Sequence, residues 1–174
     1  MLEIDTSKIQ GCLIDFDGTL LDSDEIHHRA YTLALKTIDL PYLSLEDHVK
    51  NNVGFTSEQI LEKELRKNSH TLVGLDELVL MKRYIFTQLM MKEGVKIMSG
   101  AFELINKLKE KGVKLALVSS GKFLVVQKMM LVAKLPNIFD TIVAREMVTK
   151  TKPDPESYNV AMKNLNIDKQ NCRL

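Results

Sequence analysis

The stretch CLIDFDGTLLDSDE, residues 12–25, joins an apolar run to five acidic side chains. Residues 9–16 form the short, nearly uninterrupted apolar run that is typical of a strand buried on both faces in a parallel sheet. Asp15 and Asp17 lie two positions apart where this strand ends, so both side chains can point into the crevice above the sheet. Because carboxylates this close repel each other, the pair indicates a bound divalent cation or a retained proton, and both suit catalysis.

Two other interpretations of the same residues stay open at this point. Aspartate and glycine are common where a strand ends in a turn, so turn chemistry alone can account for the pair. The pattern D-x-D-G also begins a calcium-binding EF-hand loop, which requires glycine sixth and an acid twelfth. Gly18 is fourth in the pattern here, and the apolar Leu20 and Leu21 follow it, which argues against a calcium loop.

Residues 22–95 have a helical period. Ser23 or Asp24 can cap a first helix, whose apolar residues recur every three or four positions. Three further helices are predicted at 45–49, 57–65 and 75–91. The whole segment is therefore expected to be helical.

Beyond residue 100 the pattern alternates between helices and strands. Helices are predicted at 101–111, 123–134 and 155–165, and strands at 113–118 and 139–144. Such alternation predicts right-handed crossovers and a parallel sheet. Ligands of such sheets bind beyond the carboxyl ends of the strands, which brings Asp15 and Asp17 close to Ser119 and Ser120.

The sequence lacks the glycine-rich loops that bind nucleotide phosphates. Its eight glycines are never closer than six residues apart, which excludes both G-x-G-x-x-G and the Walker loop. Two other features can hold a phosphate: Ser119 with the backbone amides of Ser120 and Gly121, and Lys152 in the run TKPDP. Serines after a strand are often only helix caps and most lysines are solvated, so each feature alone is weak.

The composition is that of a soluble globular protein. Of the 174 residues, 45% are hydrophobic and 27% are charged. The formal net charge of +1 argues against a nucleic-acid surface. Cys12 and Cys172 lie at opposite ends of the chain and predict neither a disulfide framework nor a zinc site. Because no signal-peptide pattern and no membrane-spanning run is found, the protein is expected in the cytoplasm and away from membranes.

Three separated motifs together resemble the haloacid dehalogenase-like phosphohydrolase superfamily: DFDGTL at 15–20, LALVSSG at 115–121 and TKPDPE at 151–156. In order and spacing they resemble the β-phosphoglucomutase-like branch, whose members carry a small helical cap between the first two motifs. The resemblance implies an α/β fold with a Rossmann-like three-layer parallel-sheet core. That core comprises residues 1–21 and 96–174, and the all-helical cap comprises residues 22–95.

The resemblance also implies roles for the motif residues. Asp15 attacks phosphorus to form an aspartyl-phosphate, and Asp17 protonates the leaving oxygen and then activates water. Ser119, Ser120 and Lys152 hold the phosphoryl oxygens. Mg2+ is the implied cofactor, bound by the Asp15 carboxylate and the Asp17 backbone carbonyl.

The cap is expected to select the substrate. His27 falls where this branch often has a histidine beside the active site, although a histidine on a helix is more often a surface or packing residue. Ser57 occupies the position of an arginine that β-phosphoglucomutases carry after the glycine represented by Gly54. Weaker candidates are Glu25, His28 and Arg29. The expected activity is therefore that of a phosphatase acting on a small phosphorylated metabolite, such as a sugar phosphate or a nucleotide, and a phosphomutase is the alternative.

The family's fourth motif, a strand that ends in paired acids, is expected about two dozen residues after Lys152, whereas the sequence ends at Leu174. NCRL at 171–174 resembles the first step of that strand. The expectation is a piece of a longer phosphatase whose first strand has an unpaired edge, available for weak dimer formation by an otherwise monomeric protein. A catalytically incomplete remnant with a binding or regulatory role is the alternative.

Overall fold

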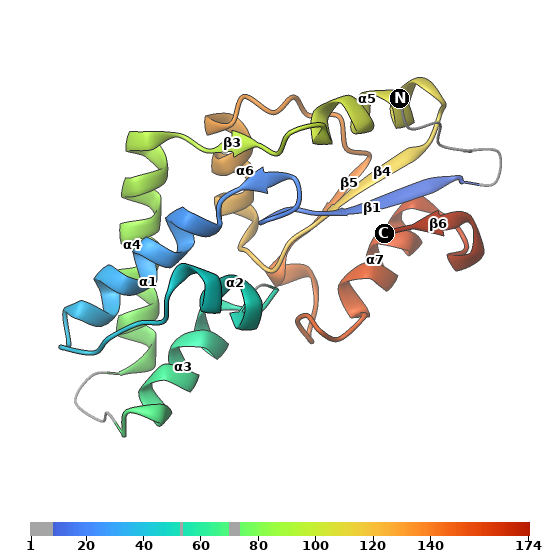
Figure 1. Ribbon diagram of the computed structural model, residues 1–174. Helices are drawn as coiled ribbons and strands as arrows, with labels where there is room; N and C mark the ends of the chain where they lie inside the picture. Colours follow the sequence, from blue (N-terminus) through green and yellow to red (C-terminus); the bar gives the residue numbers. More distant parts are fainter. Residues whose placement is uncertain (1–8, 53, 70–73) are drawn as a thin grey trace.

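The computed structural model describes residues 9–52, 54–69 and 74–174, which form a parallel sheet with flanking helices and a group of helices beside it (Figure 1). Four strands lie in the order β5-β4-β1-β6, and all neighbouring pairs are parallel. Their bounds are Gly11–Asp15 for β1, Lys114–Val118 for β4, Thr141–Val143 for β5 and Cys172–Arg173 for β6. The predicted α/β class with a parallel sheet is confirmed.

Strands β1 and β4 end at the same level. Gly11 pairs with Lys114, and four residues later Asp15 pairs with Val118. The last four residues of β4 are buried, as expected for a strand covered on both faces. Side chains that follow the two strands therefore meet at one edge of the sheet.

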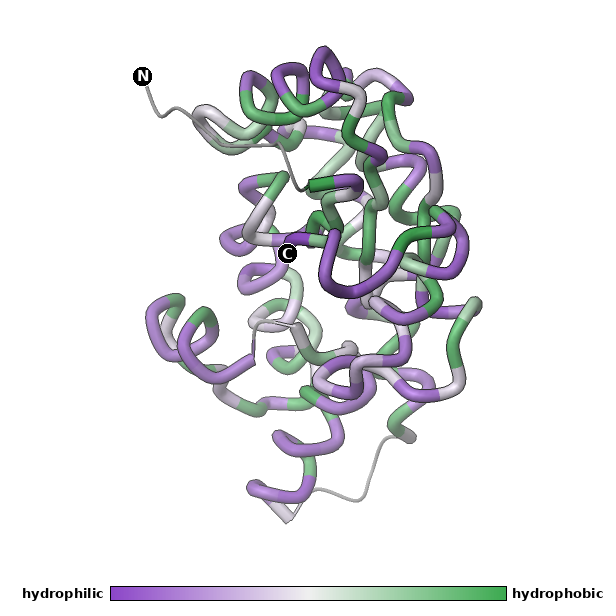
Figure 2. The backbone as a smooth tube through the Cα atoms, turned by 90° about the vertical axis from the view of Figure 1, so that its right-hand side faces the viewer, coloured by the Kyte–Doolittle hydropathy of each residue, from purple (hydrophilic) through white to green (hydrophobic). Residues whose placement is uncertain are grey.

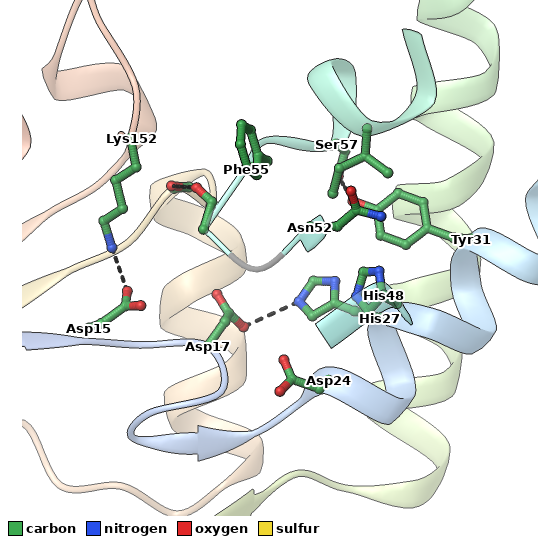
Figure 3. Close-up of a pocket in the computed structure, with 14 residues that line it drawn as sticks. Asp15, Asp17, Asp24, His27, Tyr31, His48, Asn52, Phe55, Ser57 and Lys152 are labelled. Carbon is green, nitrogen blue, oxygen red and sulfur yellow. Dashed lines mark hydrogen bonds and ion pairs between the residues drawn. The ribbon is translucent and has the colours of Figure 1, made fainter. Parts of the chain in front are cut away.

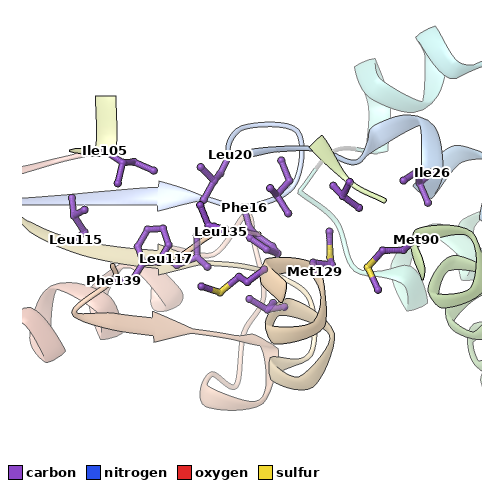
Figure 4. Packing of buried hydrophobic residues seen from close by; sticks show 14 of the residues in the cluster. Phe16, Leu20, Ile26, Met90, Ile105, Leu115, Leu117, Met129, Leu135 and Phe139 are labelled. Carbon is purple, nitrogen blue, oxygen red and sulfur yellow. The ribbon is translucent and has the colours of Figure 1, made fainter. Parts of the chain in front are cut away.

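Helices cover both faces of the sheet. They are α5 (Ala101–Glu110), α6 (Phe123–Val132) and α7 (Glu156–Leu165). On one face Leu115 and Leu117 pack in a cluster with Met129 of α6 (Figure 4). On the other face Ala116 packs in a cluster with Ala161 of α7. The side chains of β4 thus alternate between two apolar layers, and the predicted three-layer arrangement is confirmed.

Four further helices gather on one side of the sheet (Figure 1). They are α1 (Asp24–Lys36), α2 (Leu45–Asn52), α3 (Ser57–Lys67) and α4 (Leu75–Glu93). Figure 2 shows purple and green segments alternating along much of the tube, as expected where helices have one polar and one apolar face. They enclose a cluster of their own, to which Tyr31, Leu35, Leu61 and Leu78 contribute. The longest helix, α4, spans 19 residues, and no helix in the described part of the chain is both long and apolar enough to cross a bilayer.

A reciprocal cap fixes the start of α3. The Thr56 hydroxyl accepts a hydrogen bond from the Gln59 amide at 3.3 Å, and the Gln59 side chain accepts one from the Thr56 amide at 2.8 Å. This capping box satisfies two backbone donors that a helix start otherwise leaves open. Helix α3 consequently begins at Ser57.

The chain leaves and re-enters the sheet layer through two adjacent short strands. Strand β2 (Leu21–Asp22) and strand β3 (Lys96–Ile97) pair antiparallel. The division into a core and a cap at residues 22 and 95 stays a prediction. Most predicted helices and strands differ from the observed ones by a few residues at their ends, where helices fray and strands lose their partners.

The expectation that no strand lies beside the first one was wrong at one end of β1. Strand β6 pairs in parallel with it, Gly11 with Cys172 and Cys12 with Arg173. The Gln10 amide also donates to the Asn171 carbonyl at 2.8 Å. The sequence of residues 171–174 had indicated a strand, and the pairing follows because the turn after α7 returns the chain in the parallel direction.

Candidate active site

A cavity of about 90 Å³ opens where β1 and β4 end, between the sheet and the four helices α1 to α4 (Figure 3). Of the residues that the sequence analysis singled out, Asp15, Asp17, Ser120, Lys152 and His27 line it. These residues come from opposite ends of the chain and from the helical segment. The cavity is therefore the candidate active site.

Asp15 and Lys152 form an ion pair although 137 positions separate them. The Lys152 ammonium donates to Asp15 Oδ1 at 2.5 Å and to the Val118 carbonyl at 3.2 Å. Asp15 Oδ1 also accepts the Phe16 amide at 2.8 Å. The second carboxylate oxygen, Oδ2, accepts no hydrogen bond from the residues that the structure describes. One oxygen of Asp15 is thus held in place and the other is free to react.

Asp17 lies in a tight turn that requires glycine at the next position. Gly18 has a φ of +70°, and a Cβ there would lie 2.9 Å from an oxygen of Asp24. Asp17 Oδ1 accepts hydrogen bonds from Ser23 Oγ at 2.8 Å and from His27 Nε2 at 3.2 Å. Burial raises the pKa of Asp17, but the bonds from His27 and Ser23 and the nearby positive charge outweigh it and hold the pKa below its ordinary value. Asp17 is therefore ionised at neutral pH.

A buried lysine contacts His27 at the ring nitrogen that does not face Asp17. Lys82 of α4 is 2% exposed, and its Nζ lies 2.8 Å from His27 Nδ1. The His27 ring stacks on Phe86 with 4.1 Å between the ring centroids. Burial, together with the Lys82 charge, lowers the pKa of His27, so the imidazole is neutral. A neutral His27 that donates from Nε2 to Asp17 accepts at Nδ1, which is the atom that Lys82 approaches.

Sequence reasoning missed Lys82, although a signal was present. Leu78, Lys82 and Phe86 follow one another at intervals of four residues, and all three are buried. A lysine within the apolar stripe of an amphipathic helix is costly unless it has a partner. That position on the stripe could have marked Lys82 as a candidate.

The two serines after β4 have different hydrogen-bond partners. Ser119 is buried, and its hydroxyl accepts the Gly121 amide at 3.0 Å, so one of the two amides expected to hold phosphate is already engaged. The Ser120 amide donates to no described residue and remains available. The Ser120 hydroxyl donates to the Gly54 carbonyl at 3.0 Å. Ser120 therefore links the sheet edge to the loop before α3.

The weaker candidates of the helical segment do not line the cavity. Arg29 forms an exposed ion pair with Glu93 at 2.6 Å, and His28 Nε2 donates to the Leu43 carbonyl at 2.7 Å. Glu25 is exposed. Ser57 does line the cavity, and its hydroxyl accepts a bond from the Tyr31 hydroxyl at 3.2 Å. The helical wall also includes His48, Asn52 and Phe55, which the sequence had not marked.

Oxygen atoms suited to a hard cation are present beside the cavity. Asp15 Oδ2 and the backbone carbonyl of Asp17 accept no hydrogen bond within the described chain. Oxygen is the ligand type that Mg2+ prefers. No group of three or more His, Cys, Asp or Glu side chains able to hold a metal occurs among the described residues.

Comparisons of the sequence connect this geometry to known proteins. The family model described as haloacid dehalogenase-like hydrolase matches residues 12–173. Protein CbbY of Cereibacter sphaeroides is 24% identical over 165 residues, covering 91% of this chain and 72% of that protein. Pyrophosphatase PpaX of Listeria monocytogenes serotype 4a is 27% identical over 173 residues, covering 95% of this chain and 73% of that protein.

Solved structures share the fold. CbbY of Rhodobacter sphaeroides in complex with phosphate has a TM-score of 0.78 at 23% identity, covering 94% of this chain and 76% of that chain. β-Phosphoglucomutase of Clostridium difficile has a TM-score of 0.81 at 19% identity, covering 94% of this chain and 74% of that chain. The resemblance to the haloacid dehalogenase-like superfamily, stated from the three motifs, is confirmed by the family model, and the fold is that of these solved structures.

Proposed function

The chain belongs to the haloacid dehalogenase-like hydrolases, and on this basis we propose that it is a magnesium-dependent phosphomonoester hydrolase that acts through an aspartyl-phosphate on Asp15. The observation that carries the proposal is the environment of this carboxylate. Lys152 holds Oδ1 at 2.5 Å, while Oδ2 has no partner among the described residues and Asp17 lines the same cavity. A fixed nucleophile, an adjacent cation and a second carboxylate are the groups that displacement at phosphorus requires.

In the proposed reaction a carboxylate oxygen of Asp15 attacks phosphorus, and the bond from phosphorus to the leaving oxygen breaks. Asp17 gives a proton to that leaving oxygen. It then takes a proton from the water that attacks the phosphoryl group, and inorganic phosphate and free Asp15 result. Lys152 and the unengaged Ser120 amide bind the phosphoryl oxygens, whose negative charge they stabilise.

The low pKa of Asp17 is compatible with its proposed role as a proton donor. A bound phosphate dianion places negative charge beside the carboxylate, which favours its protonated form. Both observed hydrogen bonds are made to Oδ1. Oδ2 is consequently the oxygen available to carry the proton.

Magnesium fits the donor atoms of this site, because Asp15 Oδ2 and the Asp17 carbonyl are free oxygens. When bound, Mg2+ neutralises the charge of the phosphoryl group. Two protein oxygens leave most of an octahedral shell to water and to the substrate. This division is typical of magnesium sites at phosphates.

The proposed substrate is a small phosphorylated metabolite, and both the relatives and the site support this class. One relative is named a pyrophosphatase, and a solved relative holds phosphate.

We place the protein in the cytoplasm, since both cysteines are free thiols and a reducing compartment keeps them so.

The test is hydrolysis of p-nitrophenyl phosphate in the presence of Mg2+. Asp15→Asn is expected to lower kcat at least about a thousandfold, because it removes the nucleophile and keeps the shape. Asp22→Asn is the matched control, since Asp22 is an exposed carboxylate of the same segment and is expected to retain full activity. Acid-quenched protein should carry one phosphoryl group in the parent and none in Asp15→Asn. Turnover retained by a folded Asp15→Asn protein would refute the proposal.

A further inference from the structure

We propose that the helical wall of the cavity selects phosphate monoesters with a small, uncharged, hydroxylated leaving group, that is, short-chain polyol phosphates. This inference rests on the proposed function. Asp15 and Lys152 lie on the sheet side of the cavity, and Tyr31, His48 and Asn52 lie on the helical side (Figure 3). A phosphate held by Lys152 therefore directs the rest of its ester toward the helical wall.

A hydrogen-bonded chain fixes the proton positions in that wall. The Asn52 amide donates to the Tyr42 hydroxyl at 3.1 Å, and that hydroxyl lies 2.7 Å from His48 Nδ1. In the arrangement we propose, the Tyr42 hydroxyl accepts from Asn52 and gives its own proton to His48 Nδ1. Burial lowers the pKa of His48 to about 4, so the ring is neutral and carries its proton on Nε2.

The two end residues of this hydrogen-bonded series, His48 and Asn52, each have one atom left to bind a ligand. Neither His48 Nε2 nor Asn52 Oδ1 has a hydrogen-bond partner within the described residues. Both residues line the cavity. Neither atom is among the fully buried, unpartnered side-chain atoms of the described residues, which agrees with an opening toward the cavity. The wall thus offers one donor and one acceptor, which a hydroxyl group or a diol satisfies at once.

Charge excludes a second acidic group on the substrate. Lys152 is the one lysine or arginine among the described residues that line the cavity, and Asp15 already pairs with it. Ser57, an uncharged residue, stands on the helical wall, and Asp17 and Asp24 add negative charge at the base. The Lys82 ammonium lies behind this wall, 3.4 Å from Ser57 Oγ, and does not line the cavity. A carboxylate or second phosphate would therefore lose water there without direct contact to a cation, at a substantial cost in binding.

The size of the cavity also favours a small leaving group. The cavity of about 90 Å³ is well below the several hundred Å³ of sites that enclose drug-sized ligands. The Ser120 hydroxyl closes part of its wall by bonding to the Gly54 carbonyl at 3.0 Å. A short polyol fits such a space, whereas a nucleotide with its base does not.

The experiment compares kcat/KM for glycerol 3-phosphate, 3-phosphoglycerate, AMP and p-nitrophenyl phosphate with Mg2+ present. The two three-carbon esters differ mainly in that a carboxylate replaces a hydroxylated carbon. Glycerol 3-phosphate is expected to exceed both 3-phosphoglycerate and AMP by about tenfold or more. No hydrolysis of any ester refutes the proposed function. Hydrolysis of p-nitrophenyl phosphate without this preference refutes the inference alone.

Variants locate the preference in the wall. Asn52→Leu should lower kcat/KM for glycerol 3-phosphate, relative to p-nitrophenyl phosphate, about tenfold through loss of one hydrogen bond. Asn51→Leu is the matched control, because Asn51 is exposed and its side chain donates, within the described residues, to the Asp47 carbonyl of its own helix. Ser57→Arg should raise the relative rate with 3-phosphoglycerate by adding the missing cation. An unchanged ratio in both Asn52→Leu and Ser57→Arg would overturn the assignment.

Discussion

Lys82 carries a charge that folding removes almost completely from water, and the variant Lys82→Met tests this. Its ammonium lies 2.8 Å from His27 Nδ1 and 4.2 Å from the centre of the Tyr31 ring. The described residues give it no carboxylate within ion-pair distance. Burial, as the largest cause, lowers the pKa of Lys82 from 10.5 to about 7.

This shift has a defined consequence for stability. Between about pH 7 and the unfolded pKa of 10.5, the unfolded chain binds the proton and the folded protein does not. The free energy of unfolding therefore rises with pH through this window, by about 1.4 kcal/mol per pH unit from this group. From about pH 7.5 to about pH 9.5 the contribution is about 2.5 kcal/mol.

Urea unfolding at the two pH values measures the effect. The parent should gain about 2.5 kcal/mol more on this pH change than Lys82→Met, because methionine has no proton to release. Lys92→Met, an exposed lysine of the same helix, is the control and should follow the parent. Equal pH dependence in the parent and Lys82→Met would show that the ammonium is not held in a dry environment.

Two other predictions concern the reaction and the closure of the site. Asp17→Asn should slow hydrolysis of an alkyl phosphate by about 10² to 10⁴-fold but affect p-nitrophenyl phosphate much less, since p-nitrophenolate leaves without a proton. Steady-state rates with both esters check this, and equal losses would contradict an acid role. Ser120→Ala removes the bond to the Gly54 carbonyl and should raise KM several-fold with little change in unfolding free energy, of about 1 kcal/mol. An unchanged KM would show that this bond does not hold the site closed.

The sequence predicted the layers and the meeting of distant residues well. Patterns with a period of 2 in strands and 3.6 in helices identify buried faces directly, and paired parallel strands of equal length that start together also end together. This is why Asp15 could be placed near Ser119 and Ser120 from the strand ends, whereas Lys152 was assigned to the same site through the resemblance of its motif. The predictions of a shared site for Asp15, Asp17 and His27 agree with the cavity lining, while their chemical roles stay predictions.

The helical wall was less predictable. Lys82, His48 and Asn52 are buried polar residues. Lys82 depends on His27 of another helix, and His48 and Asn52 depend on Tyr42 in the irregular segment before their own helix. Helical periodicity identifies the face of a residue but not the residue opposite it. Strand β6 was underestimated because two residues carry almost no periodicity.

The paired strands β2 and β3 place the exit and the return of the helical insertion next to each other, with Leu21 opposite Ile97 and the Met98 amide 2.9 Å from the Leu20 carbonyl. An insertion whose two ends adjoin can be exchanged during evolution without altering the sheet that carries it. The residues that bind the phosphoryl group and those that contact the rest of the substrate can therefore change at different rates during evolution. The same sheet can then act on new substrates when the helical insertion is replaced, while the reaction at phosphorus stays unchanged.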